Sequence, residues 1–321
     1  MDVIQLLDIL SDGEFHSGED LGRRLGITRA AVWKRLQYLA VLDISVEASR
    51  GRGYRIAGGM DLLNRDQILS AIAPEALSLL GSLACMPEVE STNSVLLHGG
   101  GHGAVCLAER QTAGRGRRGR PWFSPYGRNL YLSVRWHFDQ GVAALEGLSL
   151  AVGVLLAETL DRAGVVDVNL KWPNDLLCGG NKLGGILIEV GGDLTGECAV
   201  VVGVGLNVFM SDALGAAGKI DQPWADLKQQ GFSGKRSELC GAILSSLLPA
   251  LNTYPAGGFS RYRERWESRC AYLNQPINVL LPAGSCEGTL LGVDSQGAVR
   301  VATEKGELSF AGGEISLRSA V

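Results

Sequence analysis

The sequence lacks the features that would place the chain in a membrane or an oxidising compartment. No stretch reaches the ~18 unbroken apolar residues of a membrane span, and the N-terminal MDVIQLLDILSDGE opens with an acid rather than the basic segment of a secretory signal. The seven cysteines form no CxxC pair and follow no regular spacing, unlike a disulfide framework or a zinc knuckle. These absences predict a cytoplasmic protein with reduced thiols and no membrane partner.

The chain also has no excess of positive charge. Lysine and arginine number 30 against 34 acids, a net charge of −4, so any nucleic acid must be bound by a local patch. Apolar residues make up 46% and charged residues 20%, which excludes disorder caused by low hydrophobicity. At roughly 100–200 residues per domain, the 321 residues allow two or three domains.

Residues 1–59 have the pattern of three short helices followed by a β-hairpin. An apolar stripe predicts the first helix, Ser17 with Asp20 has the form of a capping box that opens the second, and Thr28 can cap a third that runs to about Leu39. SRGRGYRI at 49–56 is typical of a wing, with glycines at its tip and arginines for phosphate. The pattern predicts a winged helix-turn-helix.

The charges of this segment favour DNA as its partner. Residues 1–20 carry six acids and no lysine or arginine, whereas 28–57 carry six bases against two acids. The alternatives are an ordinary solvated face or a surface for protein contacts, and an exposed Trp33 would be unusual in a DNA groove. The expected DNA-binding residues are Ser17, Thr28, Arg29, Ala30, Trp33, Lys34, Gln37, Arg50 and Arg52.

The rest of the chain changes pattern at about residue 270. Before it, apolar β-like runs surround a helical pattern at 145–162; after it, short alternating strands are separated by turn signals, as in a small β-barrel. The fold class expected is therefore α+β and multidomain. Its expected parts are a winged helix at 1–61, a mixed α/β catalytic domain at 65–270 and a β-barrel at 271–321.

The strongest chemical signal is QTAGRGRRGRPW at 111–122, where four arginines alternate with glycines. Guanidinium groups bind phosphate or carboxylate through paired hydrogen bonds, and glycines let a ligand approach the backbone, so we expect an anionic ligand to order this loop. Its GxGxxG is not a dinucleotide fingerprint, because Pro121 and Pro125 prevent a helix from following. An exposed arginine-rich loop that touches DNA is the alternative.

Two further segments place glycines beside polar side chains. KWPND at 171–175 makes a turn, and Lys182 enters a strand through two glycines, where a ligand can lie against bare backbone. This lysine is not part of a P-loop, since the order GxxxxGK[ST] is absent. GVGLN at 203–207 allows a strand to pack closely on a ligand or, equally well, on a neighbouring strand.

The sequence shows no metal-binding or nucleophile motif. His98 and His102 are separated by glycines that deny them a common helical face, so no metal site built from protein ligands is expected. There is no GxSxG and no HExxH, and the cysteines carry no local signature of a nucleophile. A reaction without a covalent enzyme intermediate fits this composition.

Taken together, the motifs closely resemble those of the biotin protein ligases. The resemblance is carried by Ser91-Thr92-Asn93, GRGRRGR at 114–120 with Trp122, KWPND at 171–175, KLGGILIE at 182–189 and GVGLNV at 203–208. With its winged helix, the chain is similar over essentially its whole length to the bifunctional bacterial members that also repress the biotin operon. The resemblance implies a central fold like that of class II synthetases and biotin–lipoate ligases, with an SH3-like C-terminal barrel.

Members of that family join biotin to ATP, giving biotinyl-5′-adenylate and pyrophosphate, and pass biotin to one lysine of the biotin carboxyl carrier protein of acetyl-CoA carboxylase. The resemblance implies ATP with Mg²⁺, placed near Asp175, and biotin as substrate and corepressor precursor. It also implies operator DNA of the biotin-synthesis genes as a partner, and a homodimer that forms on ligand binding.

The residue roles follow from the same resemblance. Converting a carboxylate to an anhydride with AMP requires positive charge on the α-phosphate and on departing pyrophosphate; the expected catalytic residues are Arg115, Arg117, Arg118 and Lys182. The implied biotin-binding residues are Ser91, Thr92, Asn93, Gln111, Gly114, Arg115, Gly116, Arg117, Lys182 and Gly185. The implied nucleotide-binding residues are Trp122, Asn174, Asp175, Asn207, Trp224 and Arg318.

Three other functions compete with this interpretation. A lipoate ligase or another adenylate-forming acyl transferase shares the domain type but has no need of the RGRRGR loop or of KLGGIL. A ligand-sensing repressor without catalysis has no need to keep four loop arginines and Lys182. A DNA-binding scaffold without enzymatic activity leaves the glycine-lined motifs unexplained.

Overall fold

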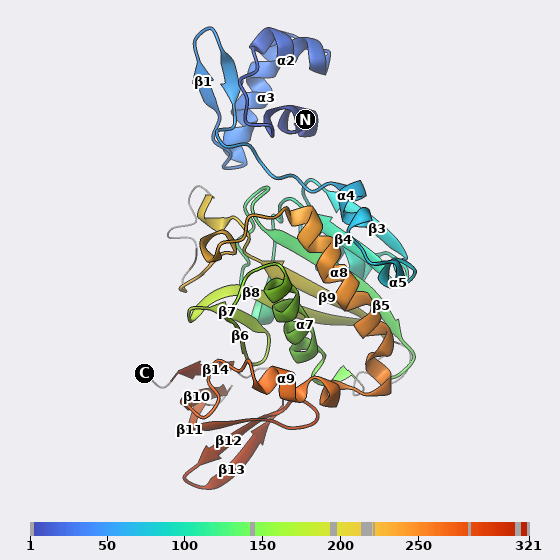
Figure 1. Cartoon of the computed structure of the whole chain (residues 1–321), viewed down its shortest axis with the longest axis vertical. Helices are drawn as coiled ribbons and strands as arrows, with labels where there is room; N and C mark the ends of the chain where they lie inside the picture. The colour runs from blue at the N-terminus through green and yellow to red at the C-terminus, as the bar shows by residue number, and fades with distance from the viewer. Residues whose placement is uncertain are drawn as a thin grey trace.

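The computed structural model describes residues 3–141, 145–192, 198–212, 220, 222–281, 284–311 and 316–319. Along the long axis of the molecule, a small helical part with a β-hairpin lies at one end, a large mixed sheet with its helices in the middle, and a second sheet at the other end (Figure 1). Within the described ranges, no helix combines the length and apolar character needed to cross a bilayer.

The N-terminal part is a winged helix-turn-helix. Its elements are α1 (Ile4–Leu10), α2 (Gly18–Leu25), α3 (Arg29–Val41) and the antiparallel pair β1 (Glu47–Ser49) and β2 (Gly53–Arg55). Both predicted caps are confirmed: Ser17 Oγ accepts from the Asp20 N–H at 3.0 Å and Thr28 Oγ1 from the Ala31 N–H at 3.3 Å. The third helix runs two residues beyond the predicted Leu39 and ends at Val41.

The core of the winged helix receives one side chain from the central part of the molecule. Leu6, Leu21 and Leu39 are fully buried there, and Tyr126, which lies more than sixty residues further along the chain, belongs to the same apolar cluster together with Met60. Burial of aromatic and aliphatic surface is the main favourable term in such a contact. The winged helix is therefore packed onto the central part and not only tethered by its linker.

A seven-stranded mixed sheet forms the centre. Its strands, in spatial order, are β3 (Ser82–Met86), β4 (Ala104–Ala108), β5 (Leu130–Phe138), β9 (Cys198–Leu206), β8 (Asn181–Gly192), β7 (Asp175–Cys178) and β6 (Val168–Lys171). Strands β3 and β4 pair in parallel and all other neighbours are antiparallel. The apolar runs expected to be strands are confirmed, as is the helix expected at 145–162, which begins at Leu148.

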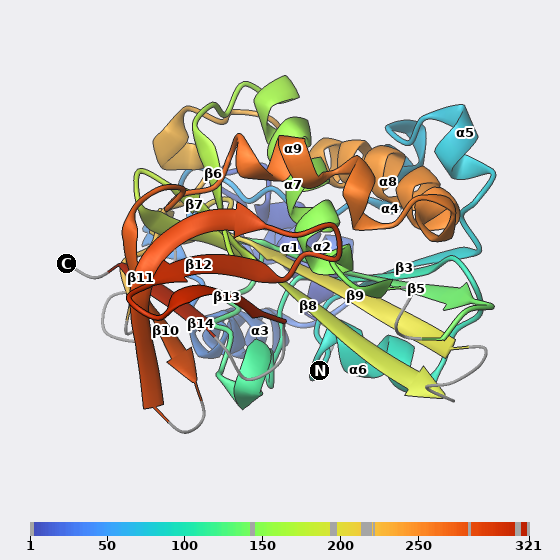
Figure 2. The same ribbon diagram turned by 90° about the horizontal axis from the view of Figure 1, so that it is seen from below.

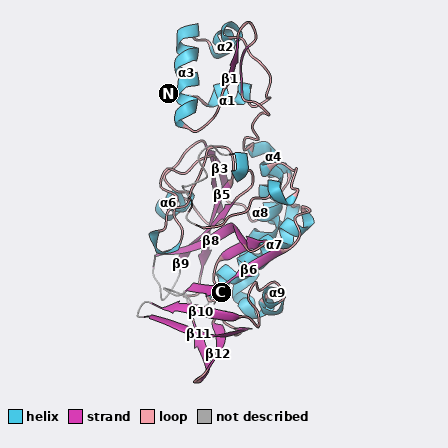
Figure 3. Ribbon diagram, turned by 90° about the vertical axis from the view of Figure 1, so that its left-hand side faces the viewer, coloured by secondary structure: helices cyan, strands magenta, loops and turns pink. Residues whose placement is uncertain are grey.

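Helices cover both faces of this sheet. Helix α6 (Thr92–His98) lies on one face, and α7 (Leu148–Arg162) with α8 (Arg236–Thr253) lies on the other (Figure 2). The remaining helical segments are α4 (Arg65–Ser70), α5 (Pro74–Leu77), α9 (Arg263–Glu267) and the 3₁₀ turns η1 (Arg117–Gly119), η3 (Met210–Asp212), η4 (Lys228–Gln230), η5 (Tyr254–Ala256) and η6 (Phe259–Arg261). Seen from the side, α6 lies to one side of the sheet and α7, α8 and α9 lie to the other (Figure 3).

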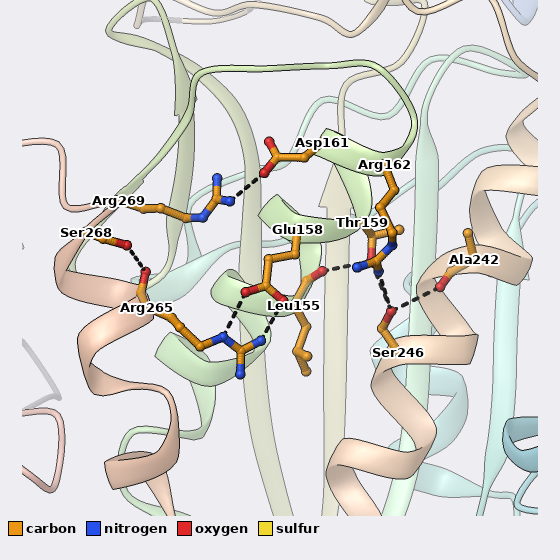
Figure 4. A network of polar contacts seen from close by, with 10 residues as sticks. All are labelled: Leu155, Glu158, Thr159, Asp161, Arg162, Ala242, Ser246, Arg265, Ser268 and Arg269. Atoms are coloured by element: carbon orange, nitrogen blue, oxygen red, sulfur yellow. Dashed lines mark hydrogen bonds and ion pairs between the residues drawn. The ribbon is translucent and has the colours of Figure 1, made fainter.

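Ion pairs fasten the helices of the α7 and α8 face to each other. Arg265 on α9 donates to both oxygens of Glu158 on α7, at 2.8 and 2.5 Å, and Arg269 pairs with Asp161 one turn further along (Figure 4). On the opposite side of α7, Thr159 Oγ1 lies 3.1 Å from Ser246 Oγ of α8. These contacts are partly exposed and each contributes little, but together they hold the helices in register.

The C-terminal part is a five-stranded antiparallel sheet. In spatial order it contains β13 (Gly306–Phe310), β12 (Val299–Thr303), β11 (Gly284–Val293), β10 (Pro276–Leu281) and β14 (Ser316–Ser319). Its inward-facing residues, such as Ile277, Val279 and Leu290, join the apolar core of the central part. The expected fold class, with its winged helix, mixed central sheet and small C-terminal β domain, is confirmed.

Candidate ligand-binding site

The floor of the site is bare backbone in the middle of the central sheet. Gly185 of β8 pairs directly with Gly205 of β9, and both face away from α7, because the neighbouring Ile186 packs against Gly153 of α7. The indole of Trp122 lies flat over these glycines: a Cβ on Gly205 would come within 2.7 Å of it, and a Cβ on Gly185 within 3.4 Å. A planar ligand could use the same glycine surface.

One wall is a buried polar network at the start of α6. Gln111 Oε1 accepts from the backbone N–H of Thr92 at 2.9 Å, and the Thr92 hydroxyl lies 3.2 Å from the same oxygen. Ser133 of β5 places its hydroxyl 2.7 Å from Thr92 Oγ1 and 2.6 Å from Asn93 Oδ1. Sequence reasoning missed Ser133, whose only signal was a polar residue in the middle of an apolar strand.

The second wall joins the arginine loop to the sheet. Arg115 donates to Ser94 Oγ at 2.9 Å and forms an ion pair with Glu189 at 3.0 Å. Glu189 in turn accepts from the Asn93 amide at 2.7 Å. Glu189 was also missed, although strand alternation from Gly185 places it on the ligand face of β8.

At the other end of the glycine floor lies a group of cationic and amide side chains. Lys182 Nζ is 2.8 Å from Asp175 Oδ1 and 5.4 Å from the centre of the Trp122 ring. Arg117 Nη1 reaches Asn174 Oδ1 at 3.5 Å. Burial, and then the charge of the adjacent Arg118, lower the pKa of Arg117 despite the opposing effect of Asp175. The local charge balance therefore favours binding of an anion.

The arginine loop itself forms a closed turn. The Gly116 N–H donates to Arg120 O at 2.7 Å and the Trp122 N–H to Gly114 O at 2.8 Å, which brings the two limbs together. The tip is the single 3₁₀ turn η1, in which Arg118 is exposed and takes a left-handed φ of 58°. No α-helix begins at the GxGxxG, in agreement with the prediction; that a ligand orders the loop stays a prediction.

The indole N–H of Trp122 marks where a ligand could be bound. This donor is buried and has no hydrogen-bond partner among the described residues. Buried donors in folded proteins are nearly always satisfied, so an unpaired one beside a glycine floor and Lys182 is a candidate contact to a ligand oxygen.

The other residues expected at the site have more varied positions. Ser91 is buried directly before α6, and Gly114 is buried against Gln111 and Ser124. Asn207 donates to the backbone oxygens of Lys182 and Ala225, at 3.3 and 3.1 Å, and so holds two segments together.

Two of the expected nucleotide-binding residues are located by the contacts of their backbone. Trp224 makes a β-bridge to Lys182, which brings the backbone of residue 224 to the edge of the site. The side chain of Arg318 lies outside the described residues; its backbone pairs with Asn278 in the C-terminal sheet.

The residues expected to contact DNA lie on the winged helix, at the far end from the C-terminal sheet (Figure 1). Ser17 and Thr28 use their hydroxyl groups to cap α2 and α3. Arg52 stacks on the ring of Phe15 at 4.0 Å, and Trp33 is 55% exposed. The exposed members of the set on α3 and the wing are Arg29, Ala30, Trp33, Lys34, Gln37, Arg50 and Arg52.

An arginine-rich loop beside a glycine floor, in a mixed sheet joined to a winged helix, is typical of a ligand-binding enzyme domain with a DNA-binding module. Comparison with known families agrees. Residues 87–207 match the biotin/lipoate A/B protein ligase family, residues 272–318 the biotin protein ligase C-terminal domain, and residues 3–55 an HTH domain.

Individual relatives extend the match to the whole chain. The bifunctional ligase/repressor BirA of Escherichia coli is 39% identical over 99% of this chain and 97% of its own length. The biotin–[acetyl-CoA-carboxylase] ligase of Paracoccus denitrificans is 33% identical over 67% of this chain and 91% of its own. The biotin protein ligase of Aquifex aeolicus, solved with biotin and ATP, superposes with a TM-score of 0.66 at 29% identity, covering 75% of this chain and all of that one. The chain belongs to the BirA family of bifunctional ligase/repressors.

Proposed function

We propose that the protein activates biotin with ATP and transfers it to a specific lysine of the biotin carboxyl carrier protein of acetyl-CoA carboxylase, and that its adenylate-bound dimer represses the biotin-synthesis operon. The observation that carries the enzymatic part is the group of Arg115, Arg117 and Lys182 around a glycine floor. Each of these cations is already oriented by a polar side chain: Glu189, Asn174 or Asp175. Little reorganisation is therefore needed when a negative charge develops between the cations.

In the first step the biotin carboxylate attacks the α-phosphorus of ATP. A bond forms between the carboxylate oxygen and phosphorus, the bond to the bridging oxygen breaks, and pyrophosphate leaves with the electron pair. Arg117 and Lys182 neutralise the phosphates, while Arg115 and the network of Thr92 and Gln111 hold the biotin side of the pocket. In the second step the carrier lysine attacks the acyl carbon and AMP leaves.

The donors present fit Mg²⁺ that arrives with ATP. Asp175 supplies one carboxylate, and no group of three potential metal ligands occurs in the described part of the chain. Magnesium is commonly bound by one or two carboxylates together with substrate phosphates, so Asp175 with Asn174 beside it is the place where protein oxygens would hold the ion. When bound, the ion supplies charge neutralisation for the departing pyrophosphate.

The winged helix supports the regulatory half of the proposal. The exposed face of α3 carries Arg29, Lys34 and Gln37, with Arg50 on the wing, a composition that suits insertion of α3 into the major groove with phosphate contacts on either side. A dimer that forms once the ligand loops are occupied would bring two such modules onto two half-sites. The proposed partners, ATP, carrier protein and DNA, support a cytoplasmic location.

The proposal assigns one function to each part of the chain. Residues 1–61 bind DNA, 65–270 carry out adenylation and transfer, and 271–321 form the C-terminal domain, whose Arg318 is proposed to contribute to nucleotide binding. Support comes from the family matches at 3–55, 87–207 and 272–318, each of which falls within one of these ranges.

Pyrophosphate–ATP exchange tests the first half-reaction without the carrier protein. We expect Mg²⁺-dependent exchange with biotin and little with lipoate or octanoate. Faster exchange with lipoate or octanoate would show that this acid, and not biotin, is the substrate. The absence of exchange with all three acids would favour a ligand-sensing repressor without catalysis.

A further inference from the structure

Arg236 is a buried charged side chain outside the ligand site described above. It is the first residue of α8 and is fully buried. Its guanidinium donates to Glu109 Oε2 at 2.7 Å, to Asn129 O at 2.9 Å and to the backbone oxygen of Asp61. Its backbone N–H donates to Asp61 Oδ2 at 2.7 Å. All of these partners lie far from it in the sequence.

These partners are the two ends of the arginine loop and the linker of the winged helix. Glu109 directly follows β4, where the loop begins, and Asn129 directly precedes β5, where the loop has returned to the sheet. Asp61 belongs to the segment that leaves the winged helix. Glu109 also accepts from the Leu63 N–H at 2.5 Å, so the acid holds the linker directly as well as through Arg236.

A backbone hydrogen bond and two apolar contacts join the same segments a second time. The Gly127 N–H donates to Glu109 O at 3.0 Å, which joins the outgoing and returning limbs of the loop. Gly127 lies so close to Met60 that a Cβ would come within 2.6 Å of its sulfur. The adjacent Tyr126 is buried in the core of the winged helix. The base of the ligand loop and the base of the DNA-binding module are therefore one packed unit.

We propose that Arg236 is a positioning residue for adenylation. It fixes both ends of the arginine loop to the linker and to α8, and so sets the position of the loop relative to the glycine floor. This inference rests on the proposed function. A planar guanidinium can donate to three acceptors in fixed directions, whereas a lysine ammonium offers one compact charge and cannot hold Glu109, Asn129 O and Asp61 O together. Arg236 touches neither the glycine floor nor Lys182, so its effect must pass through the position of the loop.

The test compares Arg236→Lys with Arg265→Lys. Arg265 likewise pairs with a carboxylate, to which it donates two hydrogen bonds, but it lies on the face of the sheet opposite the site. Biotin-dependent pyrophosphate exchange is measured to separate KM for biotin from kcat, and limited trypsin digestion is used to follow cleavage after the loop arginines. For Arg236→Lys we expect a rise in KM of about tenfold with a smaller change in kcat, and faster cleavage within 115–120. Neither quantity should change in Arg265→Lys.

The inference is overturned if Arg236→Lys matches Arg265→Lys in both KM and the rate of loop cleavage. If Arg236→Lys does not yield folded protein, Glu109→Gln serves in its place, because glutamine keeps the acceptor for Leu63 but loses the charge that binds Arg236, and the same two readouts decide. If the wild type shows no biotin-dependent exchange, the proposed function fails, while the trypsin comparison still shows whether Arg236 holds the loop.

Discussion

Replacing Gly205 with alanine should separate the role of the glycine floor from general stability. The backbone of Gly205 lies in strand β9 and has no positive φ, so alanine is conformationally acceptable there. Its new Cβ would lie 2.7 Å from Cε2 and 2.8 Å from Cζ2 of Trp122. Carbon atoms pack best at about 3.5–4.0 Å, so the indole must move away by about 1 Å.

A displacement of this size is large for an indole that is expected to position a nucleotide. Misplacing a reacting or orienting group by about 1 Å can reduce the rate about a hundredfold. We expect kcat/KM for ATP in the exchange assay to fall by about 10- to 100-fold, equivalent to roughly 1.4 to 2.7 kcal/mol of transition-state stabilisation.

Gly191→Ala is the matched control on the paired strand β8, outside the glycine floor. Its Cβ would meet Leu97 Cδ2 at 3.8 Å, an ordinary contact, so its kcat/KM should stay within about twofold of the wild type. Urea unfolding of both variants checks that the fold is kept. Equal kcat/KM in the wild type and Gly205→Ala would refute the role given to the glycine floor.

Three further changes test other parts of the account. Arg118→Ala, at the exposed tip of the loop, should increase release of free biotinyl-adenylate into solution, seen by chromatography of the filtrate; unchanged release and unchanged kinetics would contradict an active role for the loop. Glu189→Gln should raise KM for biotin severalfold, because Arg115 loses its charged partner; an unchanged KM would show that this ion pair does not shape the pocket. Burial raises the pKa of Cys85 and Cys270 from 9.0 to about 11, so these thiols stay protonated in the folded protein where the unfolded chain ionises. Their contribution to stability is therefore full below pH 9.0 and is lost as the pH rises towards about 11. In urea unfolding, substituting both with serine should lessen the loss of stability between pH 9 and 11, and an equal loss would contradict this assignment.

Local patterns were sufficient to predict the elements of the winged helix. Ser17 and Thr28 were predictable as N-caps because a hydroxyl oxygen can accept from the free backbone N–H three residues further along the chain. The structure confirms both caps. The end of α3 was less predictable: no glycine follows Leu39 to stop the helix, and it continues to Val41. Boundaries of this kind depend on packing more than on local sequence.

Long-range partners were beyond sequence reasoning. The motifs identified Arg115 and Lys182, but they did not show that Glu189 pairs with Arg115 and Asp175 with Lys182. Which residues of neighbouring strands lie opposite each other depends on the register of the sheet and not on distance along the chain. Arg236 had no sequence signal at all: its contact with Asp61 spans 175 residues. An arginine at a helix start is unremarkable until the fold places buried acceptors around it.

Under the proposed function, occupancy of one site governs both catalysis and DNA binding. The most direct measurement is the affinity of the wild-type protein, by fluorescence anisotropy, for a DNA fragment selected from a random-sequence library in the presence of biotin, ATP and Mg²⁺. The account predicts tight binding with biotin and ATP together, and markedly weaker binding without ligand or with ATP alone. Equal affinity in all three conditions would contradict it.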